Sequence, residues 1–176
     1  MHLQAISRDV VEITARRGCG RRLRQSALQT WGLVLPPVGK LTRSGTLTAL
    51  GIGPDTWSIM AVAAEPDALF NTLHVALHQT AAVVETGHGL VAMTLSGVRA
   101  RHVLAKGCRL DLHPQVFQTG DVARTIVAQI PVLLWQIDNE PRFGLAAPLT
   151  LAHSFVHFVL AASAEVGCTI LPISKE

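Results

Sequence analysis

The chain has 176 residues, of which 49% are hydrophobic and only 15% charged, and its formal net charge is +3. Because an ordinary globular domain carries roughly 25% charged residues, a chain this apolar is expected either to cross a membrane or to bury part of its surface against other proteins. Its best apolar run, residues 126–135, is shorter than the ~20 residues of a spanning helix and contains Gln129 and Pro131, so we expect a subunit of a larger protein and no membrane span.

The first half of the chain predicts an alternation of short strands and helices. Residues 10–16 alternate and are rich in β-branched side chains, which is typical of a strand. Residues 21–32 carry apolar side chains at helical spacing and end at Gly32, a preferred residue at a helix C-terminus. Residues 33–45 are punctuated by prolines and glycines and predict a loop. The elements expected after this loop are strands at 47–53 and 56–63, a helix at 66–80 and a strand at 81–86.

The second half repeats this order more loosely. The elements expected there are a strand at 90–97, a helix at 98–107, a loop at 108–121, one long strand at 123–138, a strand at 142–148, a helix at 149–167 and a last strand at 168–173. In the first of these helices we expect Val98, Val103 and Leu104 to face inward. We expect the long strand to be bent or bulged near Pro131, because proline cannot donate a hydrogen bond to a neighbouring strand.

Both halves therefore have the order strand–helix–strand–strand–helix–strand, which is that of a split βαβ or ferredoxin-like unit. We predict an α+β fold made of two such lobes, an N-terminal one at residues 1–86 and a C-terminal one at residues 87–176, which could also pack as one unit. The repeat spans half of the chain, so it indicates an internal duplication and not a solenoid.

Two motifs between residues 16 and 24 have simple structural interpretations. The run GCGRRL resembles the start of a dinucleotide-binding fingerprint, but Leu23 stands where the third glycine is required. The five arginines of this segment could contact phosphates, yet the cluster is short and aromatic residues make up only 5% of the chain. We therefore expect a solvated helix face or contact with an acidic partner, and no nucleic-acid binding.

Two histidine pairs have the spacing of zinc ligands on a helix. His74 and His78, and likewise His153 and His157, are four residues apart and share one helix face. Neither pair has the glutamate that follows the first histidine in a metalloprotease motif, and a third ligand is not evident. We expect both pairs on packing faces and predict no metal site.

The three cysteines, Cys19, Cys108 and Cys168, are odd in number and far apart, and no Cys-x-x-Cys motif occurs. We therefore predict reduced, mostly buried thiols and no disulfide framework. The first residues lack the basic-then-apolar layout of an export signal, so we expect a cytoplasmic location.

Cys108, Asp111 and His113 form the densest group of reactive residue types. A thiol nucleophile needs a base within hydrogen-bond reach and a nearby positive charge that lowers its pKa, which Lys106 or Arg109 could supply. However, all of these residues follow one another on a single loop, whereas catalytic cysteine and histidine usually come from distant parts of a chain. The favoured interpretation is structural: Asp111 accepts backbone N–H bonds in a turn.

Residues 95–136, which begin LSGVRARHVLAKGCRLDLHP, closely resemble the gamma subunit family of bacterial heterotetrameric sarcosine oxidase. The residues that carry the likeness are Ser96-Gly97, Leu104 to Cys108 and Leu110 to Pro114. The stretch LGIGPDTWSIMA at 50–61 also resembles the family's Gly-Pro-Asp-Glu-Trp segment, with Thr56 in place of the acid. The likeness is strong over 86–136, fair over 47–62 and weak elsewhere.

The resemblance implies a fold like the front part of the glycine-cleavage aminomethyltransferase. It implies a complex of alpha, beta, gamma and delta chains that oxidatively demethylates sarcosine to glycine, with tetrahydrofolate taking the one-carbon unit. In that family FAD, FMN and NAD belong to the alpha and beta chains, tetrahydrofolate to alpha and zinc to delta. For this chain we therefore expect no catalytic, cofactor-binding or metal-binding residue. A candidate subunit-contact loop carries Lys106, Arg109, Asp111 and His113.

Two alternatives follow from the same residues. Residues 85–88, Glu-Thr-Gly-His, replace an Asp-x-Ser type of segment in the family, which leaves open a related complex acting on another secondary amine, such as N-methylglutamate. The second alternative is a free-standing, folate-binding aminomethyltransferase-like enzyme, for which Glu85 and Asp111 are the nearby carboxylates.

Overall fold

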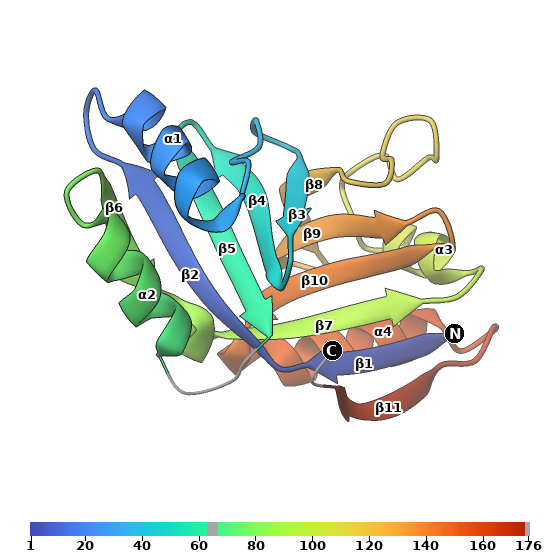
Figure 1. Ribbon diagram of the computed structural model, residues 1–176. Helices are drawn as coiled ribbons and strands as arrows, with labels where there is room; N and C mark the ends of the chain where they lie inside the picture. Colours follow the sequence, from blue (N-terminus) through green and yellow to red (C-terminus); the bar gives the residue numbers. More distant parts are fainter. Residues whose placement is uncertain (63–66, 175–176) are drawn as a thin grey trace. The chain divides into compact units, whose positions relative to one another are not determined.

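The computed structural model describes residues 1–62 and 67–174, and these residues form two compact units (Figure 1). The first, called here the N-terminal unit, consists of residues 8–87; the second, the C-terminal unit, joins residues 1–7 to residues 88–174. Residues 1–7 were expected in the N-terminal lobe. They contribute a strand to the C-terminal unit because they pair there with two strands from distant parts of the chain.

The N-terminal unit is a five-stranded antiparallel sheet with two helices. Its elements are β2 (Arg8–Ala15), α1 (Gly20–Trp31), β3 (Leu41–Ser44), β4 (Leu47–Gly53), β5 (Thr56–Val62), α2 (Ala68–Leu77) and β6 (Ala81–Glu85). The strands lie in the order β3-β4-β5-β2-β6. The last four have the order of a ferredoxin-like sheet, and β3 is added at its edge.

The strand β3 occupies part of the segment for which the sequence predicted a loop. It pairs with β4 from Leu41↔Leu50 to Ser44↔Leu47, and Gly45 turns the chain between them with φ of 56°. A two-residue hairpin with glycine at its first turn position matches the twist of the flanking strands. The strand is short and partly polar, so its own β-propensity is weak. Its pairing with β4 makes it a strand.

Both helices of the N-terminal unit pack on one face of its sheet. Leu23 of α1 and Leu73 of α2 lie in a single buried cluster with Ile13 of β2 and Trp57 of β5. Helix α1 ends at Gly32 as predicted, with φ of 61°, and the Gly32 N–H donates to the Leu28 carbonyl at 2.9 Å. Glycine adopts this left-handed conformation without the steric cost that other residues meet.

The C-terminal unit has a six-stranded sheet, and its strand order can be followed in Figure 1. Its elements are β1 (His2–Ile6), β7 (Leu90–Ser96), α3 (Ala100–Ala105), β8 (Val122–Val127), β9 (Ile130–Asp138), β10 (Arg142–Pro148), α4 (Ala152–Ala162) and β11 (Thr169–Ser174), with short 3₁₀ turns η1 (Gly87–Gly89) and η2 (Leu149–Leu151). The order is β11-β1-β7-β10-β9-β8, and β1 pairs in parallel with β11 and antiparallel with β7.

The two units share one topology. Without β1, the order β11-β7-β10-β9 corresponds to β6-β2-β5-β4 of the N-terminal unit, and β8 corresponds to the added edge strand β3. The predicted α+β class and the repeated split βαβ unit are therefore confirmed. Strand β1 is an insertion into the second copy, because it separates two strands that would otherwise be neighbours.

Residues 123–138 form two strands, not the single bent strand that the sequence predicted. Strands β8 and β9 pair antiparallel up to Val127↔Ile130, which leaves Ala128 and Gln129 as a two-residue turn. Both turn residues have positive φ, 49° and 68°, as a type I′ hairpin requires. Such turns usually contain asparagine, aspartate or glycine, so this sequence carries no local signal for the turn.

Helix α3 is shorter than predicted, and one of the three residues expected to face inward does not. Val103 and Leu104 are fully buried as expected, but Val98 is 86% exposed because it precedes the first helical residue, Ala100. Among the helices of residues 1–62 and 67–174, none has both the length and the apolar character needed to cross a membrane.

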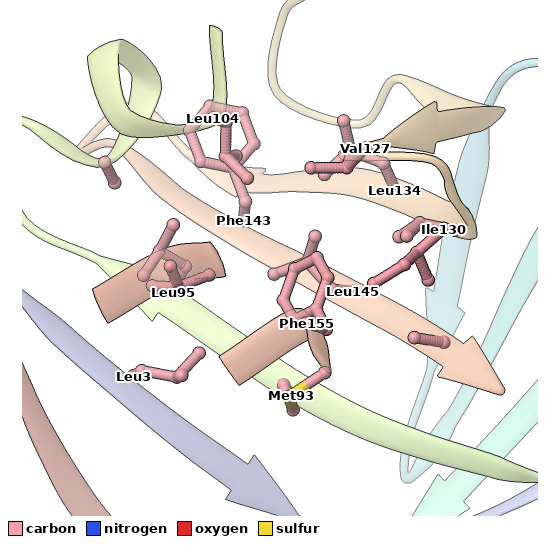
Figure 2. Close-up of a cluster of buried hydrophobic side chains, with 14 of the residues drawn as sticks. Leu3, Met93, Leu95, Leu104, Val127, Ile130, Leu134, Phe143, Leu145 and Phe155 are labelled. Carbon is pink, nitrogen blue, oxygen red and sulfur yellow. The ribbon is translucent and has the colours of Figure 1, made fainter. Parts of the chain in front are cut away.

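Figure 2 shows the core of the C-terminal unit, where helix and strand side chains interlock. Leu104 of α3 and Phe155 of α4 lie in one cluster with Phe143 and Leu145 of β10, and all four side chains are fully buried. Burying one side chain of this size contributes about 1.5–3 kcal/mol. This core fixes α3 on the sheet and so positions the start of the loop that follows it.

Candidate functional site

The loop between α3 and β8, residues 106–121, carries the four predicted contact residues. Lys106 begins it and is bonded within its own unit: its Nζ donates to the Ala162 carbonyl at 2.7 Å and to Glu165 Oε1 at 2.5 Å. His102 Nε2 lies 3.1 Å from the same carboxylate oxygen. Hydrogen bonds from Lys106 and then from His102 lower the pKa of Glu165. Lys106 therefore ties the loop to the end of α4.

The Cys108, Asp111 and His113 side chains each bond a different group. Asp111 Oδ1 accepts the His113 backbone N–H at 2.8 Å, and His113 Nδ1 accepts the Gln115 N–H at 3.3 Å. The Cys108 Sγ lies 4.0 Å from Thr125 Oγ1, which is a weak contact. Each side chain thus bonds its own turn or a neighbouring strand, and the predicted role of Asp111 as a turn acceptor is confirmed.

Arg101 organises the loop and was not singled out from the sequence. Its Nη1 donates to the carbonyl oxygens of Leu112 and, at 3.3 Å, Phe117, and its Nη2 donates to Gln136 Oε1 at 3.0 Å. The guanidinium also lies over the Phe143 ring, 5.1 Å from its centroid. Burial lowers the pKa of Arg101. The sequence signal was weak: an arginine three residues before Leu104, on the packed side of a short helix.

A cavity of about 360 Å³ opens beside this arginine. The residues that line it are Arg101, Pro114, Gln118, Thr119, Gln136, Asn139 and Pro141, and we call it the loop cavity. Gln136 is 3% exposed and donates from Nε2 to the Asp138 carbonyl at 3.0 Å. Thr119 Oγ1 donates to Asn139 Oδ1 at 2.9 Å. The walls are therefore held by hydrogen bonds from the loop to the β9–β10 hairpin.

The two histidine pairs lie on exposed helix faces, contrary to the expectation that they would pack. Leu69, Leu73 and Leu77 form the packed face of α2, and Phe155, Val159 and Ala162 that of α4. His78 Nδ1 lies 3.1 Å from the Val75 carbonyl, and its ring centroid is 5.9 Å from that of His74. The described residues contain no group of three or more His, Cys, Asp or Glu that could hold a metal ion.

The arginines of α1 lie on a solvated helix face, which is one of the two interpretations predicted for them. Arg21, Arg22 and Arg24 are exposed, while Leu23 between them is buried. Arg24 Nη2 pairs with Asp55 Oδ1 at 2.9 Å. These arginines form the solvated face of an amphipathic helix.

Comparison with known proteins assigns the chain to a family. Residues 21–165 match the model of the family described as sarcosine oxidase, gamma subunit family. The chain belongs to this family. The gamma subunits of sarcosine oxidase from Arthrobacter sp. and from Corynebacterium sp. strain U-96 are 33% and 34% identical to it, over 73% and 76% of its length. The matched region of this family member spans 63% and 65% of those two relatives.

Solved structures show the same relationship in three dimensions. One solved structure is the heterotetrameric sarcosine oxidase from Corynebacterium sp. U-96 in complex with pyrrole 2-carboxylate. One of its chains is similar to this gamma-family chain, with TM-score 0.80 and 28% identity, and the match covers 93% of this chain and 83% of that one. The glycine cleavage system aminomethyltransferase T from Bartonella henselae matches 98% of this chain and 47% of its own, with TM-score 0.72 and 16% identity. The predicted aminomethyltransferase-like architecture is confirmed; at that identity the second likeness shows the fold alone.

Proposed function

We propose that this chain is the gamma-type subunit of a heterotetrameric sarcosine oxidase and that it supports assembly instead of catalysis. The observation that carries the proposal is the family match over residues 21–165, joined to the fold it shares with a chain of the heterotetrameric enzyme. The low charged fraction, 15%, supports it, because a subunit held permanently by larger chains can keep apolar surface that a free protein cannot.

The proposal assigns the chemistry to the partner chains. The complex oxidatively demethylates sarcosine to glycine and passes the one-carbon unit to tetrahydrofolate, using FAD, FMN, NAD and zinc held by alpha, beta and delta subunits. Cys108 Sγ contacts Thr125 Oγ1 and His113 Nδ1 accepts the Gln115 N–H, so the thiol and the imidazole bond different groups. This arrangement supports a role without catalysis. Among the described residues all three cysteines are free thiols, which supports the proposed cytoplasmic location.

Within the α3–β8 loop, we assign the four residues two different tasks. All four side chains are exposed. Lys106, Asp111 and His113 bond within their own unit, so they hold the loop in shape. The Arg109 side chain has no hydrogen bond to the described residues, so it is the member that faces a partner subunit. A related secondary-amine oxidase, such as one acting on N-methylglutamate, would use the same loop in the same way.

Replacing the candidate nucleophile and base should leave the oxidase activity intact. We expect the complex carrying Cys108→Ala and His113→Gln to turn over sarcosine within twofold of the unmodified complex, and the chain alone to turn over none. The measurement is kcat of the co-purified complex, with equal amounts of complex verified by mass. Cys168→Ala, another half-buried free thiol, is the matched control.

A loss of tenfold or more in kcat, with assembly unchanged and the Cys168→Ala control normal, would give this chain a catalytic role. Turnover by the chain alone would favour a free-standing enzyme, and tight binding of tetrahydrofolate by the chain alone would favour the folate-binding alternative.

A further inference from the structure

The loop cavity contains a cation with unused donors. Arg101 bonds two backbone carbonyls and one amide oxygen, and no described carboxylate bonds it. A guanidinium has five N–H groups, so two of them have no partner among the described residues. Partly buried charges are ordinarily compensated by an opposite charge. Burial alone lowers the pKa of Arg101.

Two neighbouring wall residues, Gln136 and Asn139, have their side-chain oxygens occupied as acceptors. Asn139 Oδ1 accepts the Thr119 hydroxyl at 2.9 Å, which leaves the Asn139 amide N–H groups without a partner in the described chain. Gln136 Oε1 accepts from Arg101, and its Nε2 donates to the Asp138 carbonyl. A concave site with spare donors around one cation attracts an anion.

Two aspartates near the cavity bond other groups through one oxygen, and the second oxygen of Asp138, Oδ1, is buried without a hydrogen-bond partner among the described residues. Asp138 Oδ2 is paired with Arg142 Nη2 at 2.7 Å, and Asp121 Oδ2 accepts the Gln118 N–H at 2.7 Å. Neither aspartate is among the residues that line the cavity. No described carboxylate is hydrogen-bonded to Arg101, so the cavity offers a place where a bound group could supply the counter-charge.

We propose that the loop cavity binds a carboxylate group beside Arg101 and Asn139. One planar cation with neutral amide donors suits a planar, singly charged group, since a guanidinium pairs with both oxygens of a carboxylate. A phosphate dianion would meet only one positive charge here. The volume of about 360 Å³ accommodates an amino-acid-sized molecule or one acidic side chain of a partner subunit. The site does not depend on the proposed function.

Acetate binding to the full chain tests the site, with acetamide as the neutral analogue of the same shape. We expect acetate to shift the Arg101 Nε–H and Asn139 side-chain amide signals in ¹H–¹⁵N spectra, saturably and with at least tenfold higher affinity than acetamide. Arg101→Ala is a poor variant because it also releases the loop carbonyls. Asn139→Asp keeps the shape, places a carboxylate in the cavity and should weaken acetate binding at least tenfold.

Asn71→Asp is the matched control, because it makes the same change of charge at an exposed position of α2 in the other unit. It should leave acetate binding unchanged. An equal response to acetamide, no saturable shift at Arg101, or equal acetate affinities of the two aspartate variants would overturn the proposal.

The source of the carboxylate is resolved in the complex. If a partner's acidic side chain fills the cavity, Asn139→Asp should weaken assembly relative to Asn71→Asp, and acetate should no longer shift the cavity signals. If the ligand is a free small molecule, both variants should assemble equally and the unmodified complex should still bind acetate. A complex that neither binds acetate nor assembles differently with the two variants would contradict a carboxylate site.

Discussion

Replacing Gly144 with alanine is expected to destabilise the C-terminal unit by about 3 kcal/mol, near the upper end of the usual cost of overpacking a core. Gly144 of β10 stands opposite Trp135 of β9, and a Cβ on Gly144 would lie closer to the Trp135 indole than real Cβ atoms approach any heavy atom. Trp135 is only 4% exposed, so neighbouring groups enclose its ring. The measurement is urea-induced unfolding of the full chain.

Gly53→Ala is the control for the Gly144 change, because it also adds a methyl group to a strand glycine. Its Cβ would lie 3.7 Å from Thr56 Cβ, an ordinary contact, so we expect a change within about 1 kcal/mol. Replacing Trp135 with leucine should reduce the loss caused by Gly144→Ala, since the two positions are in contact. Equal losses for Gly53→Ala and Gly144→Ala would refute the explanation.

Phe155→Ala is expected to cost about 4 kcal/mol, in the range for deleting a buried phenylalanine side chain. Phe155 is fully buried in the core that Figure 2 shows, and it is the aromatic anchor of α4 on the sheet. Leu160→Ala on the same helix is the control, because Leu160 is 39% exposed and should cost about 1 kcal/mol or less. Denaturant midpoints and slopes of both variants measure the difference.

Equal midpoints for the Phe155 and Leu160 variants would mean that α4 is not anchored as the structure shows. A large loss confined to Phe155→Ala would confirm that this helix face, and not the face carrying His153 and His157, packs on the sheet.

A glycine opposite a tryptophan recurs in the N-terminal unit. Gly51 of β4 faces Trp57 of β5, and a Cβ on Gly51 would collide with the Pro37 carbonyl. The Trp57 indole N–H donates to the Pro36 carbonyl at 2.7 Å. The positions are exchanged between the two units: the tryptophan is on β5 and the glycine on β4 in one, whereas the tryptophan is on β9 and the glycine on β10 in the other. The internal repeat therefore rests on strand order and not on this pair.

Features with a strong local pattern were predictable from the sequence. Helix α1 with its Gly32 cap and the core strands such as β2 depend on periodicity and turn residues that lie within a dozen positions of one another. The order strand–helix–strand–strand–helix–strand occurs in both halves of the sequence, and this repetition was enough to predict the fold class. In the candidate site, the turn at Asp111 was predictable because its acceptor bonds a backbone group two residues away.

Features that depend on distant partners were not predictable in this way. Strand β1 exists because His2–Ile6 pairs with β7 and β11, some 90 and 170 positions along the chain. The Ala128–Gln129 turn lacks the usual turn residues. The loop cavity needs Arg101 from a helix, Thr119 from a loop and Asn139 from a hairpin, and only the folded sheet brings these together.

Native mass spectrometry of the complex, isolated through a tag on this chain from cells that also produce the alpha, beta and delta chains, tests the central claim most directly. The account predicts one assembly that contains one copy of this 18.8 kDa chain and one copy of each of three other, different chains. A spectrum that shows only the free chain or a homo-oligomer of it would contradict the account.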